Sequence, residues 1–223
     1  MKHDTGKRPA VVRESGKQRR LEIIEAALRV IARDGLRAVS HRAVAAEAAV
    51  PLAATTYYFH DLADLIAESF LYWSSAQQAN VEAFHARIQD LLEQARAGKL
   101  ERARLPGRIA EAASAYVVEQ VREYRSDRVL EFAFLHEAAR LPRLRAAVLR
   151  QQQGFLDFLQ VFHEAVGSRQ PGVDAQISHS VLLGLEKSAL LADDSGKIDT
   201  DALRVVLLGY LQGVLATSAA GGS

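Results

Sequence analysis

Side chains that commonly perform catalysis or bind metals are sparse and poorly grouped in this sequence. His136 and His163 are each followed by a glutamate, but neither pair has the second histidine of a zinc-binding HExxH helix. The acidic run from Asp193 to Asp201 lacks the ligand spacing and the terminal glutamate of a calcium loop. The sequence has no phosphate-binding glycine loop and no GxSxG turn. We therefore expect no enzyme activity, no metal and no cofactor.

The compartment is indicated by what the sequence lacks. With no cysteine, disulfides, thiolate zinc sites and a cysteine nucleophile are excluded. The first twenty residues are polar and basic, so no secretory signal is predicted. Residues 205–223 carry no charge, but their apolar part stops near Ala216, short of the roughly 20 residues that span a bilayer. We expect a cytoplasmic protein that is not inserted in a membrane.

The charge is unevenly distributed along the chain. Residues 1–60 carry 11 Lys and Arg against 6 Asp and Glu, a balance of +5, whereas residues 61–223 carry 17 against 21, a balance of −4. A basic first segment on a mildly acidic body indicates that the first segment meets a polyanion.

The elements that would present this basic segment are helices. Residues 1–16 lack periodicity and are predicted to be a flexible basic arm. Apolar residues recur at helical spacing from Lys17 to Asp34, and Gly35 follows as a C-cap. Ser40 is a good N-cap for a short second helix through Ala48. A third short helix is predicted from Pro51 to about residue 59.

The remainder of the chain is helix-forming, with no strand-like alternation. A long helix is predicted from Asp61 to at least Ser75, and later helices are separated by glycine- and proline-containing breaks. The predicted fold class is all-α, with roughly nine or ten helices: an N-terminal three-helix domain at 17–62 and a larger helical domain at 63–223.

The second and third helices fit a helix-turn-helix, in which two short helices cross steeply and share a small apolar contact. Ala45 occupies the close-approach position. Ala49 occupies the turn, where a left-handed alanine costs about 1–2 kcal/mol relative to glycine. Thr55 stands where a branched aliphatic side chain is expected. The other inward positions are acceptable: Val44, Ala48, Val50 and Tyr58.

In combination, these residues resemble the tetracycline-repressor (TetR) family of bacterial regulators. The resemblance covers about residues 18–70. It is carried by Ala26-Ala27-Leu28, Ile31, Asp34-Gly35-Leu36, Ser40, Val44-Ala45, Val50-Pro51, Thr55-Thr56-Tyr57-Tyr58-Phe59 and Leu65-Ile66.

The resemblance implies that the N-terminal domain binds double-stranded DNA, with the third helix in the major groove. Leu62 stands where relatives often place a phosphate-binding lysine, so arm and first-helix cations would compensate. The implied DNA-binding residues are Arg19, Arg20, Ser40, His41, Arg42, Leu52, Ala53, Ala54, Thr55, Thr56 and Tyr57. Because few of these side chains can bond a base edge bidentately, phosphate contacts and DNA shape would supply part of the specificity.

The resemblance also implies that the larger domain binds a small-molecule effector and forms a homodimer. Aromatic and polar residues on apolar helix faces are the ligand-binding candidates, namely Tyr116, Gln120, Phe132, His136, Gln151, Phe155, Phe158 and His179. Small and aliphatic residues of the last two helices are the dimer-interface candidates, namely Leu182, Gly184, Leu185, Ser188, Leu207, Gly209, Leu211, Gly213 and Val214.

The hypothesis is a transcriptional repressor that a small molecule of unknown identity releases from a palindromic operator. Two alternatives remain open at this stage: a constitutive dimeric DNA-binding protein without an effector, and a helical ligand-binding protein without a DNA function.

Overall fold

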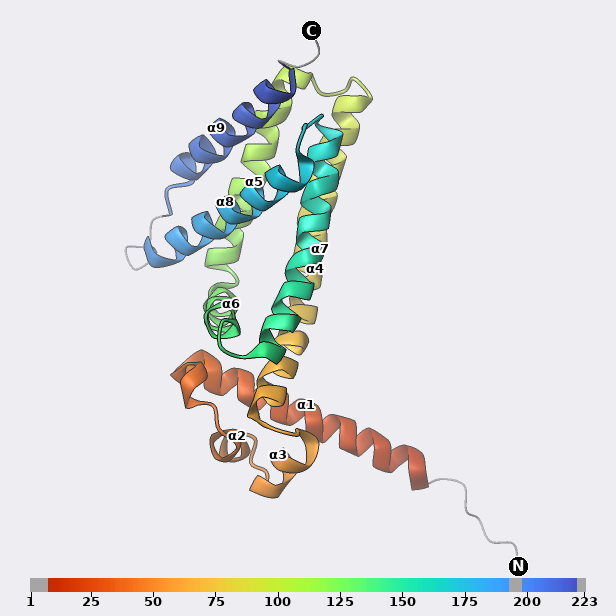
Figure 1. Ribbon diagram of the computed structural model, residues 1–223, viewed down its shortest axis with the longest axis vertical. Coiled ribbons are helices and arrows are strands. Elements are labelled where there is room, and N and C mark those ends of the chain that lie inside the picture. The colour runs from red at the N-terminus through yellow and green to blue at the C-terminus, as the bar shows by residue number, and fades with distance from the viewer. Residues whose placement is uncertain (1–7, 193–197, 220–223) are drawn as a thin grey trace, which may run out of the picture. The chain divides into compact units, whose positions relative to one another are not determined.

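The computed structural model describes residues 8–192 and 198–219, and the fold is all-α as predicted (Figure 1). Within these ranges the helices are α1 (Arg8–Asp34), η1 (Leu36–Ala38), α2 (His41–Glu47), α3 (Leu52–Tyr58), α4 (Leu62–Arg96), η2 (Arg102–Arg104), α5 (Leu105–Arg122), α6 (Arg125–Ala138), α7 (Pro142–Ala165), α8 (Pro171–Ala192) and α9 (Thr200–Ala219). None of the described helices is long and apolar enough to cross a membrane.

The first helix starts earlier than predicted. It begins at Arg8 instead of Lys17, so residues 8–16, which we assigned to the flexible arm, are helical. Pro9 is compatible with this start because the first helical turn does not require the proline N–H. The rest of the predicted arm, residues 1–7, lies outside the described residues.

The helices belong to two compact units. Unit 1 contains the chain up to Ala76 together with Val129–Leu149, and unit 2 contains Gln77–Arg128 together with the chain from Arg150 onward. We predicted a single boundary, between residues 62 and 63. The two compact units instead divide the chain at three places, inside α4, α6 and α7. The reason is that α4 continues to Arg96, far beyond the predicted minimum, and supplies both cores.

The core of unit 1 joins the three N-terminal helices to the first half of α4. Val30 of α1, Val44 of α2 and Leu65 of α4 are each at most 1% exposed. Farther along α4, the ring of Phe70 meets that of Phe134 edge-on, with centroids 5.4 Å apart. Burying such aromatic pairs stabilises a core beyond the area they remove from water, so this cluster anchors α4.

The core of unit 2 forms where α5 packs along α8 and α9. Val117 and Val121 of α5 are fully buried there. The same unit buries an ion pair, with Arg128 Nη1 3.5 Å from Glu186 Oε2. Because two buried charges are costly unless they remain together, this pair holds the first turn of α6, which belongs to unit 2, against α8.

Candidate nucleic-acid interface and ligand cavity

The turn between α2 and α3 has the geometry that the helix-turn-helix prediction required. Ser40 caps α2, its Oγ accepting a hydrogen bond from the Ala43 N–H at 3.1 Å. Ala49 adopts a left-handed φ of 53°, and the next residue, Val50, donates its N–H to the Ala45 carbonyl at 2.9 Å. The strained alanine therefore sits at the bend that sets the angle between the two helices.

Helix α3 presents an exposed face of mixed apolar and hydroxyl character. Tyr57 is 82% exposed and Leu52 is 47% exposed, and Ala53 and Thr56 are also exposed. Thr55 is fully buried instead, and its hydroxyl donates to the Leu52 carbonyl at 2.8 Å. Our prediction that Thr55 contacts DNA is therefore wrong. Its β-branched side chain fills the inward position, and the local hydrogen bond satisfies its polar atom.

A surface network that the sequence analysis missed braces α2 against α1. Arg29 Nε donates to one carboxylate oxygen of Glu47 at 2.8 Å, and Arg33 Nη1 donates to the other at 2.9 Å. These hydrogen bonds, first from Arg29 and then from Arg33, lower the pKa of Glu47. The network holds the helix-turn-helix to α1 through charge-assisted bonds.

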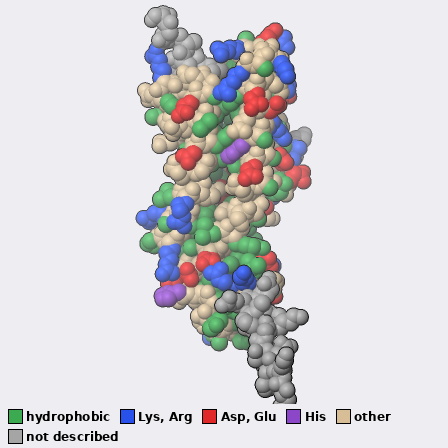
Figure 2. All heavy atoms as spheres, turned by 90° about the vertical axis from the view of Figure 1, so that its right-hand side faces the viewer, with side chains coloured by type: hydrophobic (Ala, Val, Ile, Leu, Met, Phe, Trp, Pro, Cys, Tyr) green, Lys and Arg blue, Asp and Glu red, His purple; other side chains and the backbone are tan. Residues whose placement is uncertain are grey.

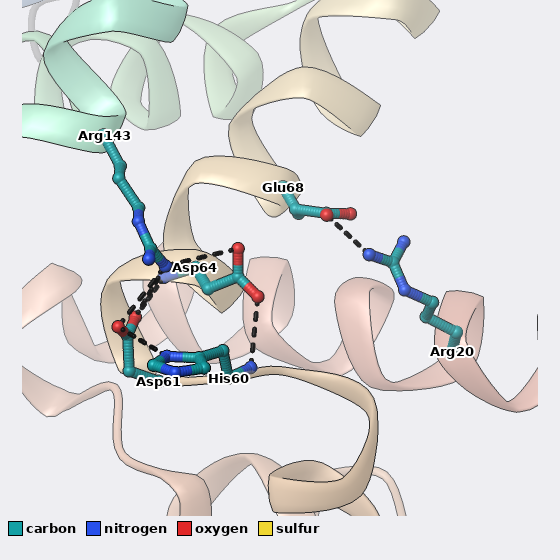
Figure 3. Close-up of polar contacts among 6 residues, drawn as sticks. All are labelled: Arg20, His60, Asp61, Asp64, Glu68 and Arg143. Carbon is teal, nitrogen blue, oxygen red and sulfur yellow. Dashed lines mark hydrogen bonds and ion pairs between the residues drawn. The ribbon is translucent and has the colours of Figure 1, made fainter.

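A second polar cluster fixes the start of α4, immediately after α3 (Figure 3). The Asp64 N–H donates to Asp61 Oδ1 at 2.7 Å, and the His60 N–H donates to Asp64 Oδ2 at 3.1 Å. Arg143, at the start of α7, places Nη1 3.3 Å from both Asp61 oxygens. The pKa of Asp61 is lowered, mainly by the Asp64 backbone N–H. The cluster ties α7 to the helix that follows α3.

Two of the predicted phosphate-binding cations form ion pairs within unit 1. Arg20 pairs with Glu68 of α4 (Figure 3). Its guanidinium carbon lies 5.0 Å from the centroid of Phe59. Arg19 pairs with Glu22 at 3.0 Å. In the space-filling view, basic and acidic side chains intermingle over the visible face and form no separate patches (Figure 2). Because the contacts of Arg20 with Glu68 and Phe59 anchor α1 to α4, we remove Arg20 from the phosphate-binding candidates.

Cations suited to phosphate stand around α2. Arg42 on α2 and Arg37 on η1 are exposed, and no ion pair is found for either within the described part of the chain. The sequence analysis missed Arg37, although its place three residues before the Ser40 cap could have indicated it. His41 is half-buried, and its Nδ1 has no partner in the structure. A contact from either arginine to a DNA phosphate would help to orient α3 in the groove.

Unit 2 contains an apolar cavity of about 40 Å³. None of the described residues that line it is charged, and two carry hydroxyls, Ser178 and Tyr210. The full lining is Phe84, Ile88, Ile109, Ala113, Phe158, Leu159, Phe162, Ser178, Val181, Leu182, Leu207, Tyr210 and Leu211. A wider recess of about 350 Å³ beside Pro171 has four glutamines among its nine described lining residues and no aromatic residue among them. The apolar cavity is the better ligand site, because such sites combine aromatic walls with a few polar groups.

A chain of buried and half-buried polar groups passes along this cavity. His163, which is fully buried, places Nε2 2.7 Å from Ser178 Oγ. Ser178 Oγ lies 2.9 Å from the hydroxyl of Tyr210, which donates to the Asp174 carbonyl at 2.9 Å. Burial lowers the pKa of His163 and raises the pKa of Tyr210. Both groups are therefore held in their neutral forms.

His85 is a second histidine beside the cavity that the sequence analysis missed. Its ring stacks on Phe158 with centroids 3.5 Å apart, and Phe155 lies 5.5 Å from it. Its buried Nε2 has no hydrogen-bond partner, and desolvation lowers its pKa to about 4. The one sequence signal that could have identified His85 is its position next to Phe84 on a long helix. That signal is weak by itself.

The structure gathers only some of the predicted ligand residues. Phe158 lines the apolar cavity, and Phe155 joins His85 to His179, whose ring is 5.7 Å from that of Phe155. Tyr116 and Gln120 line a neighbouring recess of about 60 Å³ that shares Phe84 with the cavity. The remaining three lie away from these recesses: Gln151 and His136 are exposed on their helix surfaces, and Phe132 and His136 belong to unit 1. Helical periodicity identified an apolar face without telling which neighbour it meets, so the ligand role of those three stays a prediction.

The predicted dimer-interface residues divide into three groups by exposure. Four of them are at most 7% exposed within the single chain and serve its own core, so they are unavailable to a partner: Leu182, Leu207, Leu211 and Val214. Leu185 and Gly184 are half-buried. Ser188, Gly209 and Gly213 are exposed. The apolar area on the open faces of α8 and α9 comes from residues the sequence analysis did not name, namely Val173, Ile177, Leu191, Val205 and Val206.

Metal binding finds no support in the geometry. Within residues 8–192 and 198–219, no group of three or more His, Asp or Glu is arranged to hold an ion. Of the acidic run singled out in the sequence, residues 193–197 lie outside the described residues. Asp199 accepts a hydrogen bond from the Ala202 N–H at 2.9 Å and so caps α9.

Two family models match the sequence. Residues 23–68 match the model described as bacterial regulatory proteins, tetR family, and residues 104–216 match the tetracyclin repressor-like C-terminal domain. None of the curated proteins matches the sequence significantly.

Solved structures resemble the chain over most of its length. The multidrug binding protein EbrR complexed with ethidium has a TM-score of 0.64 at 30% identity, with 86% of this chain and 98% of that chain covered. EbrR complexed with proflavin has a TM-score of 0.60 at 31% identity, covering 86% and 99%. A member of the TetR family from Streptomyces coelicolor A3 has a TM-score of 0.58 at 30% identity, covering 86% and 98%.

Proposed function

The chain belongs to the tetracycline-repressor family, whose members are DNA-binding repressors with ligand-binding C-terminal domains, and from this premise we propose that it represses transcription as a homodimer on a palindromic operator until a small molecule bound in unit 2 releases it. The single observation that carries the DNA-binding part is the exposed α3 surface behind the Ala49 turn. The family resemblance alone would not identify which residues of α3 contact DNA.

The proposed DNA interface is narrower than the sequence indicated. On α3, Leu52 and Tyr57 offer apolar contact to thymine methyls and bases, and Thr56 offers a hydroxyl. Arg42, with Arg37 beside it, would bind phosphates and fix the approach of α3. Ser40 and Ala53 are exposed in the same segment, His41 and Ala54 are half-buried there, and Arg19 remains exposed enough to contribute.

The proposed dimer interface is the open face of α8 and α9. Val173, Ile177, Gly184, Ser188 and Leu191 recur at helical spacing along α8. On α9, Val205 is 66% exposed and is followed at helical spacing by Gly209 and Gly213. Small residues between aliphatic ones allow two helices to approach closely, and two such helices from each protomer form a four-helix bundle.

The proposed effector site is the apolar cavity of unit 2. EbrR, a relative of similar fold, is a multidrug binding protein solved with ethidium and with proflavin. The cavity of this chain is smaller than the 300 Å³ or more that a drug-sized ligand occupies, so binding would require its lining to move. If the operator binds the unexpanded state better, a ligand that prefers the expanded state must weaken operator binding by the same factor by which the operator weakens ligand binding.

The decisive experiment measures binding to the DNA flanking the gene of this protein, by footprinting and by fluorescence anisotropy over a range of salt concentrations. We expect a protected palindrome and an affinity that falls steeply with salt. Arg42→Ala should weaken binding uniformly across sequences and reduce the salt slope by about 1. Arg122→Ala, an exposed arginine of unit 2, is the matched control and should leave both unchanged. Sequence-independent binding by the unaltered protein would contradict the proposal.

The oligomeric part is tested separately by analytical ultracentrifugation. Val205→Glu introduces a charge on the proposed interface and should convert a dimer into a monomer while the helical content remains. The control is Val161→Glu, since Val161 is 59% exposed on α7, outside that face. A dimer that survives Val205→Glu, or that Val161→Glu dissociates, would move the interface elsewhere.

A further inference from the structure

We infer that the effector of this protein is an uncharged, largely apolar molecule that carries one hydrogen-bond donor, which it presents to Ser178 and Tyr210. The inference rests on the proposed function, because it identifies the chemical class of ligand for the same cavity. It follows from two observations, namely the absence of charge among the described lining residues and the direction of the buried hydrogen-bond chain.

The apolar lining disfavours charged ligands. Moving an ion from water into a site without a compensating charge costs far more than moving a neutral molecule. Glu186 is the buried carboxylate of α8, but its charge is already matched by Arg128. Tyr210 stays protonated because burial raises its pKa, so it supplies no negative charge. The aromatic walls favour flat apolar molecules.

The direction of the hydrogen-bond chain follows from counting protons. The Asp174 carbonyl can only accept, so the single hydroxyl proton of Tyr210 is committed to it. The contact between Ser178 and Tyr210 must then use the proton of Ser178. Ser178 has no further proton to give, so His163 must donate from Nε2.

This arrangement leaves acceptors at the cavity and no spare donors. Each hydroxyl oxygen retains one unused lone pair, and both residues line the cavity. Nδ1 of His163, at the other end of this hydrogen-bond chain, also offers only a lone pair, and it is buried without a partner. A ligand hydroxyl or N–H can therefore gain a hydrogen bond here, whereas a ligand that can only accept finds no proton.

Four compounds of matched shape test this inference by equilibrium dialysis against the full chain. Naphthalene is neutral without polar atoms, 2-naphthol adds a donor, 2-methoxynaphthalene can only accept, and N-methylquinolinium is a bicyclic cation. We expect 2-naphthol to bind roughly fivefold more tightly than naphthalene, the effect of one net hydrogen bond. The ether should gain nothing over naphthalene, and the cation should bind at least 100-fold more weakly than 2-naphthol.

The variant Tyr210→Phe removes one acceptor while keeping the ring. It should lower the ratio of 2-naphthol to naphthalene affinity, since only the Ser178 acceptor remains, without weakening naphthalene binding. Tyr72→Phe removes the equivalent atom in unit 1, where the Tyr72 hydroxyl donates to Glu25 at 2.8 Å, and should leave the ratio unchanged. The order of the four compounds on the unaltered protein tests the inference even if Tyr210→Phe misfolds.

Two results would overturn the inference: tighter binding of N-methylquinolinium than of naphthalene, or an ether that binds as well as 2-naphthol. Failure of the proposed function gives a different outcome. If the compounds bind in the expected order but 2-naphthol leaves operator affinity unchanged, the ligand class stands and the effector role fails. If N-methylquinolinium releases the operator, the effector role stands and the ligand class fails.

Discussion

The two units place their polar side chains in opposite ways. In unit 1 the arginines and carboxylates are at the surface, where Glu47 joins α1 to α2 and Arg143 joins α7 to α4. In unit 2 the polar groups with the clearest consequences are buried, with His163, Ser178 and Glu186 each at most 6% exposed. In unit 1, ion pairs at the surface hold the helices that present the DNA-binding surface. In unit 2, the ligand cavity depends instead on a few polar groups that are shielded from water.

The aromatic residues show the same contrast and give the largest expected effect. Phe134 in unit 1 is fully buried between Phe70 and Trp73, whereas Phe158 in unit 2 faces the cavity and is only half-buried. Phe134→Ala should lower the free energy of unfolding by about 3–5 kcal/mol, because a close-packed site cannot collapse around the lost ring. Phe158→Ala should cost clearly less. Urea denaturation followed by circular dichroism measures the unfolding free energy of both variants. An equal loss in the two variants would contradict the difference drawn between these aromatic residues.

The buried histidines predict that unit 2 is sensitive to acid. His85 remains neutral in the folded chain down to its lowered pKa of about 4, whereas the unfolded chain takes up a proton near 6.5. Stability should therefore be full above pH 6.5 and fall as the pH drops toward 4, by roughly 2 kcal/mol for a ring that is partly exposed.

His85→Phe keeps an aromatic ring against Phe158 and removes the titrating group. Its unfolding free energy should fall less than that of the unaltered protein over the same pH window. His163 and His179, whose pKa values burial also lowers, are present in both proteins and cancel. If the unfolding free energies of the two proteins fell in parallel as the pH dropped, His85 would not be the source of the acid sensitivity.

The exposed tyrosine of unit 1 should affect binding without affecting stability. Tyr57→Ala should weaken operator affinity about tenfold, the loss expected for an interfacial aromatic worth about 1.4 kcal/mol. Its unfolding free energy should remain within about 0.5 kcal/mol of the unaltered protein, since Tyr57 is 82% exposed. Tyr57→Phe separates the ring from the hydroxyl. A Tyr57→Ala protein with full affinity, measured by anisotropy, would remove Tyr57 from the proposed interface.

The smallest expected effect is at the turn of unit 1. Ala49→Gly should raise the free energy of unfolding by about 0.5–1 kcal/mol, because glycine relieves the left-handed strain but loses more chain entropy on folding. Denaturation by urea is again the measurement. A destabilised Ala49→Gly protein would show that the alanine methyl packs favourably enough to outweigh its backbone conformation.

Short-range patterns accounted for much of unit 1. The Ser40 cap, the left-handed Ala49 and the short helices on either side are local features, and each follows from the chemistry of a few consecutive residues. The same reasoning misassigned Thr55, although it had noted that Thr55 occupies an inward position. It also placed the start of α1 at Lys17, because apolar periodicity begins there while the helix itself extends to Arg8.

Sequence alone determined the helical class, the helix-turn-helix and the family, because those depend on spacing within one or two turns of chain. Only the tertiary structure decided which polar residues meet. Periodicity marks a buried face without identifying its neighbour, and so it could not bring His163, Ser178 and Tyr210 together across α7, α8 and α9. For the same reason, only the packed chain distinguished aliphatic residues needed by its own core from those left open for a partner.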